Sequence, residues 1–235
     1  RSVNWKKNKI NILDTPGFDD FVGEVIANLK VADTALIMVN AAAGVEVGTE
    51  LVWEYVEDYK TPSIFVINQM DHQKADYDAA LEQLKNRFGS KVIPIQYPLN
   101  SGESFNQIVD ALRMVMYEFP ATGGKPEKKP IPESEMARAN EMHNALVEIA
   151  AENEEGLMEK YFEEGNLSEE ELAQGLNIAL AKHDFFPVFV ASGLKDMGSG
   201  RIMGFIDDIA PSPADRFGSK LENGEVLPCN AADKT

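Results

Sequence analysis

The sequence predicts an α/β fold with a mostly parallel sheet, and two observations carry that prediction. Short apolar runs, typical of strands buried on both faces, occupy Thr34–Val39, Ser63–Ile67 and Pro187–Ala191. Apolar residues recur at helical spacing within Phe21–Leu29, Val47–Tyr59 and Asp76–Phe88. Strands that alternate with helices over short connections predict right-handed crossovers and therefore parallel pairing.

The other expected elements follow from the same signals. Lys9–Leu13 alternates apolar and polar residues as a strand does, and Gly200–Ile209 has the spacing of a helix. In the middle of the chain we expect strands at Val92–Ile95 and Met114–Phe119, a short helix from the capping box Ser104-Phe-Asn-Gln107, and a loop over 121–132. Three helices should follow, over 135–151, over 155–164 and from a second capping box, Ser168-Glu-Glu-Glu171. Residues 214–235 lack periodicity and are typical of a linker or tail.

The composition narrows the class of protein. The chain has 235 residues, enough for one sizeable core or a core with a satellite, and a net charge of −17. It contains no run of eighteen apolar residues, so we expect no membrane span. The acidic balance argues against direct, sequence-specific nucleic-acid binding, which normally uses a basic patch. The single cysteine excludes an internal disulfide and suits the cytoplasm.

Acidic residues are concentrated in one stretch of the chain. Residues 133–184 hold fourteen acidic and three basic side chains. A solvated helical surface would produce this pattern, and so would a docking face for a basic partner. The residues alone leave both interpretations open.

Three short polar motifs each follow a predicted strand. This places them at the carboxyl edge of the sheet, where open α/β folds bind ligands. The Asp14 carboxylate can hold Mg²⁺ through water, and the Gly17 N–H can approach a phosphate because no Cβ intervenes. Each motif alone is more typical of a turn or a helix N-cap, but their common position favours one shared site. The motifs are Asp14-Thr-Pro-Gly17, Asn68-Gln-Met-Asp71 and Ala191-Ser-Gly-Leu194.

These motifs resemble those of the translational GTPases and, among them, of elongation factor G. Asp14-Thr-Pro-Gly-Phe-Asp-Asp-Phe21 is similar to the family's Asp-Thr-Pro-Gly-His-x-Asp-Phe stretch, and Asn68-Gln-Met-Asp71 resembles its Asn-Lys-x-Asp motif. The resemblance extends over about residues 1–213. It implies a P-loop GTPase-type sheet, GTP or GDP with Mg²⁺ as ligands, the ribosome as partner and a cytoplasmic location.

The resemblance also implies roles for individual residues in reading guanine. The Asp71 carboxylate would accept hydrogen bonds from the N1–H and the 2-amino group of guanine, both of which adenine lacks. Asn68 would tie neighbouring loops together. The guanine carbonyl would meet the backbone N–H groups of the third motif, which come from Ser192, Gly193 and Leu194.

Three departures from the family pattern bear on activity. Phe18 stands where the family has the histidine that positions the attacking water. Because phenylalanine has neither donor nor acceptor, we assign no catalytic residue and expect slow hydrolysis or none. Gln69 replaces the family lysine, so guanine affinity should be weaker. No Gly-x-x-x-x-Gly-Lys-Ser/Thr stretch occurs in the sequence. We therefore expect the phosphate-binding loop and the first strand to be missing, which leaves edges at Ile10–Leu13 and Thr34–Val39 unpaired.

The spacing of the last two motifs predicts an inserted subdomain. The 120 residues between Asp71 and Ser192 far exceed an ordinary connection of about 4–6 residues. We expect an incomplete GTPase core at 1–91 and 184–213, an acidic α+β insert at 92–183, and a linker at 214–235 toward an absent β-barrel domain. Elongation factor G carries an insert at this point, and its acidic helices contact the ribosomal stalk protein. This favours the docking interpretation of the acidic stretch.

The sequence thus predicts a fragment of an elongation factor G-like GTPase. The parent protein would bind GTP with Mg²⁺ and act in ribosomal translocation, while the isolated chain is expected to be inactive as an enzyme. Two alternatives stay open. One is a ribosomal protection or release factor of the same superfamily, and the other is a non-enzymatic module that docks on the ribosomal stalk.

Overall fold

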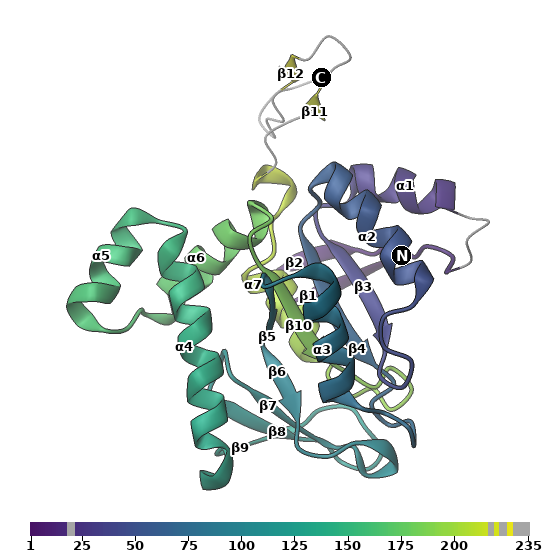
Figure 1. Cartoon of the computed structure of the whole chain (residues 1–235), viewed down its shortest axis with the longest axis vertical. Coiled ribbons are helices and arrows are strands. Elements are labelled where there is room, and N and C mark those ends of the chain that lie inside the picture. The colour runs from purple at the N-terminus through teal and green to yellow at the C-terminus, as the bar shows by residue number, and fades with distance from the viewer. Residues whose placement is uncertain (18–21, 216–218, 221–224, 228–235) are drawn as a thin grey trace.

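The computed structural model describes residues 1–17, 22–215, 219–220 and 225–227. Its centre is a four-stranded parallel sheet in the order β3-β4-β10-β5, formed by Ala35–Asn40, Ser63–Asn68, Phe186–Val190 and Val92–Pro94. Ile67 of β4 lies opposite Val39 of β3 and Val190 of β10, so these three strands end side by side. The predicted α/β fold with a parallel sheet is confirmed (Figure 1).

Each face of this sheet has its own apolar core. On one face lie α2 (Val47–Tyr59) and α3 (Tyr77–Phe88), and Trp53 stacks on Phe65 with ring centroids 5.3 Å apart. On the other face, α7 (Ser199–Asp208) packs Phe205 against Phe189 with ring centroids 5.0 Å apart. Burial of these large aromatic side chains is the main favourable contribution that holds the helices on the sheet.

The N-terminal residues form a hairpin that does not join the parallel sheet. Its strands β1 (Ser2–Trp5) and β2 (Asn8–Asn11) pair antiparallel, so the strand expected at Lys9–Leu13 begins and ends earlier along the chain. After the hairpin, α1 (Val22–Val31) joins the α2 side of the core. Among the described residues β3 pairs only with β4, so the edge predicted to be unpaired at Thr34–Val39 is open. The edge predicted to be unpaired at Ile10–Leu13 is not, because Ile10 and Asn11 pair with β1.

The exposure of β3 corrects the prediction that this strand is buried on both faces. Ile37 and Val39 point into the core and are 5% and 1% exposed, whereas Leu36 and Met38 are 44% and 53% exposed. Successive side chains of a strand point to opposite faces, and in the described part of the chain one face of β3 is left uncovered. An apolar run therefore reveals the strand but not which of its faces a neighbour covers.

Between β5 and β10 the chain builds a second unit, which is the insert of the predicted fold. Its antiparallel sheet has the order β6-β7-β8-β9. Helices α4 and α6 pack so closely that a Cβ on Gly175 would lie 2.5 Å from the Ala150 carbonyl oxygen. The strands are Gln96–Pro98, Gln107–Asp110, Val115–Glu118 and Glu127–Lys129, and α4, α5 and α6 are Met136–Glu152, Glu155–Glu164 and Glu169–Ala181. The boundaries 92–183 stay a prediction, since β5 begins at Val92 yet pairs with β10 in the central sheet.

Two local predictions inside the insert are wrong. The capping box at Ser104 begins no helix, because a 3₁₀ turn, η2 (Gly102–Ser104), leads into β7 instead. There the side-chain oxygen of Asn100 accepts the backbone N–H groups of Asn106 and Gln107, which fixes an extended path. The loop expected at 121–132 contains the edge strand β9, whose charged residues carry no alternating pattern.

The second capping box is confirmed at the start of α6. The Ser168 hydroxyl oxygen accepts the Glu171 N–H at 3.3 Å, and the Glu171 carboxylate accepts the Ser168 N–H at 2.9 Å. The Lys160 ammonium on α5 also donates to Glu171 and, with the Ser168 N–H, lowers the pKa of that carboxyl to about 2. The reciprocal bonds satisfy two N–H groups that a helix start otherwise leaves unpaired.

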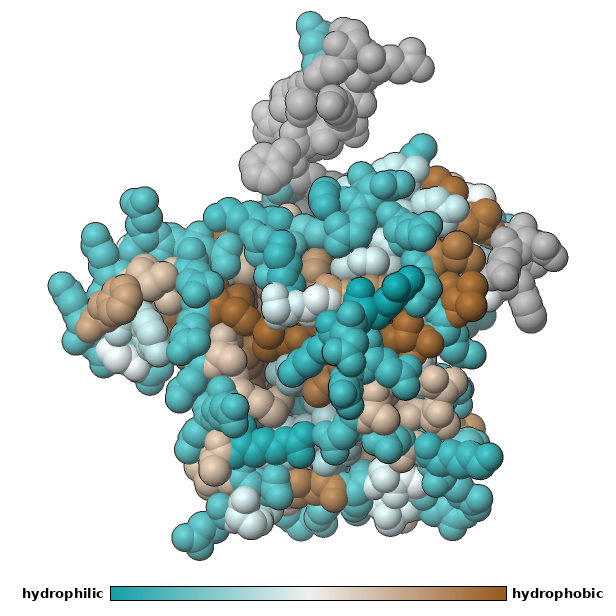
Figure 2. Space-filling model, viewed as in Figure 1, coloured by the Kyte–Doolittle hydropathy of each residue, from teal (hydrophilic) through white to brown (hydrophobic). Residues whose placement is uncertain are grey.

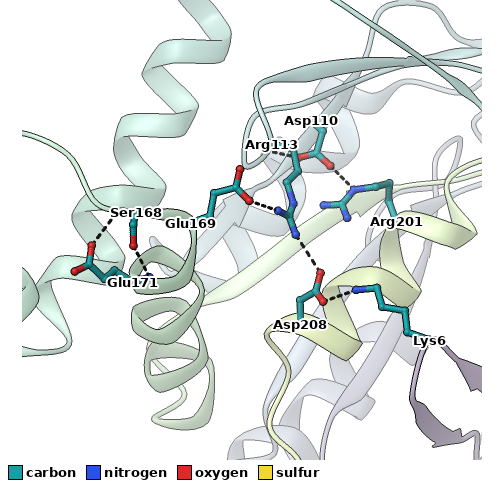
Figure 3. Close-up of polar contacts among 8 residues, drawn as sticks. All are labelled: Lys6, Asp110, Arg113, Ser168, Glu169, Glu171, Arg201 and Asp208. Atoms are coloured by element: carbon teal, nitrogen blue, oxygen red, sulfur yellow. Dashed lines mark hydrogen bonds and ion pairs between the residues drawn. The ribbon is translucent and has the colours of Figure 1, made fainter.

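A chain of charged side chains attaches the insert to the core (Figure 3). Asp208 at the end of α7 lies 2.5 Å from the ammonium of Lys6 on the hairpin and 3.0 Å from the guanidinium of Arg113. Arg113 also lies 2.7 Å from Glu169 at the start of α6. Exposed ion pairs of this kind each contribute only about 0–1 kcal/mol, so they orient the parts more than they stabilise them.

A buried ion pair lies next to this chain. The Arg201 Nε on α7 is 2.7 Å from the carboxylate of Asp110 on β7, and their side chains are 15% and 0% exposed. Burial disfavours the charged form of Arg201, but the Asp110 carboxylate outweighs it and raises the Arg201 pKa. Gln96 and the Arg113 backbone N–H also donate to Asp110. This pair is therefore the strongest polar link between core and insert.

The last described residues form η4 (Pro213–Asp215) and a short antiparallel pair, β11 (Ser219–Lys220) with β12 (Val226–Leu227). The tail expected at 214–235 thus contains local strand pairing. In the part of the chain that the structure describes, no helix has both the length and the apolar character that a bilayer crossing requires.

Candidate functional site

Two of the three predicted motifs lie side by side at the carboxyl edge of the central sheet. One is the loop after β4, residues 68–73, hereafter the Asp71 loop, and the other is the loop after β10, residues 191–197, hereafter the Ser192 loop. Their strands are parallel neighbours, and the Met70 N–H donates to the Ala191 carbonyl oxygen at 3.2 Å. The sheet topology therefore brings together side chains that are 121 residues apart in the sequence.

Side-chain hydrogen bonds join the two loops. The Ser192 hydroxyl donates to Asp71 Oδ1 at 2.6 Å, and the Gly193 N–H donates to Asn68 Oδ1 at 2.9 Å. The Ser192 Oγ also accepts the Lys195 N–H at 3.1 Å, which closes its own loop. Because Ser192 is fully buried, its hydroxyl is shielded from bulk water, whereas the Gly193–Asn68 bond lies at the surface. Asn68 and Ser192 therefore hold Asp71 in one orientation.

The Asp71 carboxylate keeps capacity for a ligand. Its Oδ1 accepts the bond from Ser192, and among the described residues its Oδ2 has no hydrogen-bond partner. An ionised carboxylate can accept two parallel donors as well as a bond from a neighbour. A base edge with two adjacent N–H donors fits this group, while a base edge without them would leave the carboxylate unpaired.

The backbone N–H groups of the Ser192 loop are partly engaged already. The Ser192 N–H donates to the Met197 carbonyl oxygen, and the Gly193 N–H donates to Asn68. Among the N–H groups of the Ser192 loop, only that of Leu194 has no partner in the described part of the chain, and the Leu194 side chain is 89% exposed. A carbonyl ligand would therefore meet the Leu194 N–H directly, or share the Gly193 N–H with Asn68.

Gln69, which replaces the family lysine, has a partner that the sequence analysis missed. Its backbone is left-handed, with φ of +63°, and its side-chain oxygen accepts a hydrogen bond from Asn40 Nδ2 at 3.1 Å. Asn40 ends β3, and its side-chain oxygen accepts the N–H groups of Ala42 and Ala43. It thus links β3 to the Asp71 loop. A carboxamide directly after an apolar strand at this edge was the available signal.

The remaining motif is placed differently. Asp14 and Gly17 are exposed, and within the described residues neither is hydrogen-bonded to the Asp71 loop or the Ser192 loop. Phe18 lies outside the described residues. The structure therefore joins two of the predicted motifs and leaves the third apart from them.

Asp14 fits Mg²⁺ only as one ligand among several. No group of three His, Cys, Asp or Glu side chains that could hold a metal occurs in the described part of the chain. Mg²⁺ usually keeps several waters and takes one or two carboxylates together with substrate phosphates. A single exposed carboxylate is compatible with that coordination when a nucleotide supplies the phosphate oxygens.

A surface groove lies away from these motifs. It has a volume of about 670 Å³ and lies beside Trp5, Tyr117 and Gly204. The cations of Figure 3 that line it, Lys6, Arg113 and Arg201, are each paired with a carboxylate. The groove therefore offers these charges to no ligand, and the paired loops are the stronger candidate site.

Comparisons with known proteins agree with this geometry. Residues 1–212 match the family model of the elongation factor Tu GTP binding domain. Over 228 residues the chain is 34% identical to an elongation factor G-like protein of Thermotoga maritima. The aligned region covers 96% of this chain and 32% of that protein. A crystal structure from Thermus thermophilus matches with a TM-score of 0.83 at 32% identity, over 92% of this chain and 32% of that one.

This chain spans about a third of the length of these relatives. The family match covers nearly all of the described residues, and it includes the central sheet, the insert and the two paired loops. The resemblance to translational GTPases is thereby confirmed: the chain belongs to the family of the elongation factor Tu GTP-binding domain.

Proposed function

We propose that this chain supplies the guanine-reading part of an elongation factor G-like GTPase. The base of GTP or GDP would bind between the Asp71 and Ser192 loops, and Asp14 would serve Mg²⁺ through water. The observation that carries the proposal is the Ser192–Asp71 hydrogen bond of 2.6 Å, which orients a carboxylate with one open oxygen. The whole protein would act on the ribosome in translocation, in the cytoplasm.

The chemistry assigned to the site is recognition rather than hydrolysis. Asp71 would accept the N1–H and 2-amino donors of guanine, and Gln69 would pack beside the base with its amide held by Asn40. The side chain of Phe18 has no donor or acceptor that could orient an attacking water. We therefore propose that GTP acts mainly through binding and is hydrolysed slowly or not at all, also in the whole protein.

The first test is a titration of the ¹⁵N-labelled chain with GDP and with ADP in the presence of Mg²⁺, followed by NMR. Amide resonances of residues 192–195 should shift with GDP at concentrations about tenfold or more below those at which ADP has an effect, since one charged hydrogen bond is sufficient for that ratio. Equal responses to GDP and ADP would remove the proposed function.

The variant Asp71→Asn sharpens this test. An asparagine amide donates where the carboxylate only accepts, so it repels the guanine donors and fits the 2-carbonyl of xanthine. The variant should lose its response to GDP and gain one to xanthosine diphosphate. Exposed Asp78→Asn, on α3, is the matched control and should leave the preference for GDP unchanged.

A second candidate function rests on the insert. Helix α5 projects from the core beyond α6, and Figure 2 shows mostly hydrophilic residues over that lobe. Acidic side chains cover it and the aromatic ring of Phe162 is 79% exposed, which together fit a partner with basic and apolar residues. We propose the ribosomal stalk protein as that partner. Binding of the purified stalk protein that is lost in Phe162→Ser and in Glu163→Lys would support this function, and equal binding by both variants would remove it.

A further inference from the structure

The insert reaches back to touch the Asp71 loop. Within the 3₁₀ turn η2, the Gly102 N–H donates to the Met70 carbonyl oxygen at 2.8 Å. The next residue, Glu103, accepts a hydrogen bond on its carboxylate from Gln73 Nε2 at 2.9 Å. One turn of the insert thus holds the Asp71 loop on both sides of Asp71, at Met70 and at Gln73.

The same turn also holds the Ser192 loop. The Lys195 ammonium donates to the backbone carbonyl oxygen of Glu103 at 2.8 Å. Glu103 therefore bridges the two loops, with its carboxylate on one and its carbonyl on the other. The Lys195 backbone N–H is bonded to Ser192, so this contact continues to the residue that orients Asp71.

A second turn of the insert packs against the Ser192 loop without side chains. The Gly124 N–H donates to the Asp196 carbonyl oxygen at 3.1 Å. At Gly123, with φ of +75°, an added Cβ would lie 1.7 Å from the Lys195 carbonyl oxygen. Only glycine allows this approach, so the two backbones are in direct contact.

Both turns are anchored in the insert. The Asn100 side chain accepts the backbone N–H groups of Asn106 and Gln107, and Phe105 is 1% exposed. The Phe119 N–H donates to the Asn106 carbonyl oxygen, which ties the second turn to the first. The contacts with the base-reading loops are therefore made by a supported segment rather than by isolated surface side chains.

We propose that Glu103, Lys195 and Gly123 are positioning residues for base recognition, through which the insert sets the separation of the Asp71 and Ser192 loops. This inference rests on the proposed function, because it names how that site is held. A carboxylate that reads two donors must be placed within roughly 0.5 Å, and the supporting shell decides such precision. None of the three residues needs to touch the base.

The test compares two glycine substitutions that differ in one respect. Gly123→Ala introduces a Cβ that strikes Lys195, whereas Gly124→Ala, at φ of +90°, introduces one with nothing within 4 Å. Both incur a similar backbone strain, so Gly124→Ala is the matched control. The readout is the ratio of affinities for GDP and inosine diphosphate, which lacks the 2-amino group. Gly123→Ala should lower this ratio by about fivefold, and Gly124→Ala should leave it within about twofold of the ratio for the unsubstituted chain.

A merely structural role would weaken binding of both nucleotides and leave their ratio unchanged, which would overturn the inference. Lys195→Met should lower the ratio in the same direction, and Lys195→Arg, which keeps a donor for the Glu103 carbonyl, should restore it. Equal ratios for Lys195→Met and Lys195→Arg would also overturn it.

A measurement without nucleotide separates this inference from the proposed function. Exchange of the Gly193 amide hydrogen, which is bonded to Asn68, should be about tenfold faster in Gly123→Ala than in Gly124→Ala. If the unsubstituted chain shows no preference for GDP over ADP, the proposed function fails. The exchange rates would still show whether the insert positions the two loops. Equal exchange rates in the two variants would overturn the inference by themselves.

Discussion

The two halves of the carboxyl edge of the central sheet differ in how they are held. On the β4–β10 side, buried Ser192, Asn68 and the insert fix the loops by hydrogen bonds within the chain. On the β3 side, β3 shows an open edge among the described residues, and the exposed Asp14 and Gly17 are not hydrogen-bonded to either of the paired loops. The sequence holds no Gly-x-x-x-x-Gly-Lys-Ser/Thr stretch that could pack there. The half that we propose reads the base is therefore held by bonds within the described chain, whereas the β3 half has an open strand edge among the described residues.

The largest expected effect on stability comes from breaking the buried Arg201–Asp110 ion pair, which links the core to the insert that supports the paired loops. Arg201→Met leaves the fully buried Asp110 carboxylate without its cation, and such a loss costs about 3–5 kcal/mol of unfolding free energy. Urea unfolding measures this change. Arg113→Met removes only partly exposed ion pairs and should cost less than about 1 kcal/mol. Similar losses in both variants would show that the buried pair is not the main link.

The next prediction tests whether the β3 side is open in solution. Val39→Ala empties a buried position and should cost about 2 kcal/mol, because Val39 is 1% exposed. Met38→Ala, on the uncovered face, should cost less than about 0.5 kcal/mol. Unfolding of the two variants in urea gives both values. A loss for Met38→Ala as large as for Val39→Ala would mean that this face is covered, and the contrast between the halves would disappear.

A smaller effect is expected from Ser192→Ala on the supported half. This variant removes the donor to Asp71 and the acceptor for the Lys195 N–H, and should cost about 1–2 kcal/mol. Faster exchange of the Lys195 amide hydrogen, with little change at Val39 on β3, would show that the effect stays in this half. Uniform acceleration would show instead that the loops and the sheet open together.

The smallest effect concerns pH and the aromatic core under the sheet. Burial lowers the pKa of His183 below its ordinary value of 6.5, although neighbouring Glu57, with a carboxylate oxygen 3.3 Å from Nε2, opposes the shift. As the pH falls, His183 is therefore protonated at a higher pH in the unfolded chain than in the folded one. The contribution of His183 to stability should be constant above about pH 6.5 and fall as the pH drops below that value. In His183→Phe the fall should be reduced, and in the exposed control His72→Gln it should persist.

The sequence predicted the parallel sheet because helical and strand periods alternate clearly from Phe21 to Phe88. It also predicted that Asp71 and Ser192 share one edge, since both follow apolar strands. The exposure of Met38 was not predictable, because an apolar run does not tell which neighbours exist. β9 (Glu127–Lys129) was missed because an edge strand of charged residues has no hydrophobic pattern.

The supporting residues of the site were beyond sequence reasoning for a related reason. Asn40 and Glu103 act through partners 29 and 92 residues away, Gln69 and Lys195. Their types are ordinary for loops, and only the folded backbone shows what they contact. Local chemistry thus identified the residues that would meet a ligand, while tertiary structure was needed to find those that hold them.

The pairing of β5 with β10 also has a consequence for how such a chain can diversify. The insert leaves the central sheet after Pro94 and returns at Phe186, on adjacent strands whose register aligns Val92 with Phe186. Its two ends are thus separated by roughly 8 Å, two residues along the strands and one strand spacing across them. A segment with such closely spaced ends can be lengthened, shortened or exchanged between homologues without shifting any strand of the sheet. A transplanted insert would have to keep the turns at Glu103 and Gly123 to contact the loops, and Asp110 to pair with Arg201 of the core.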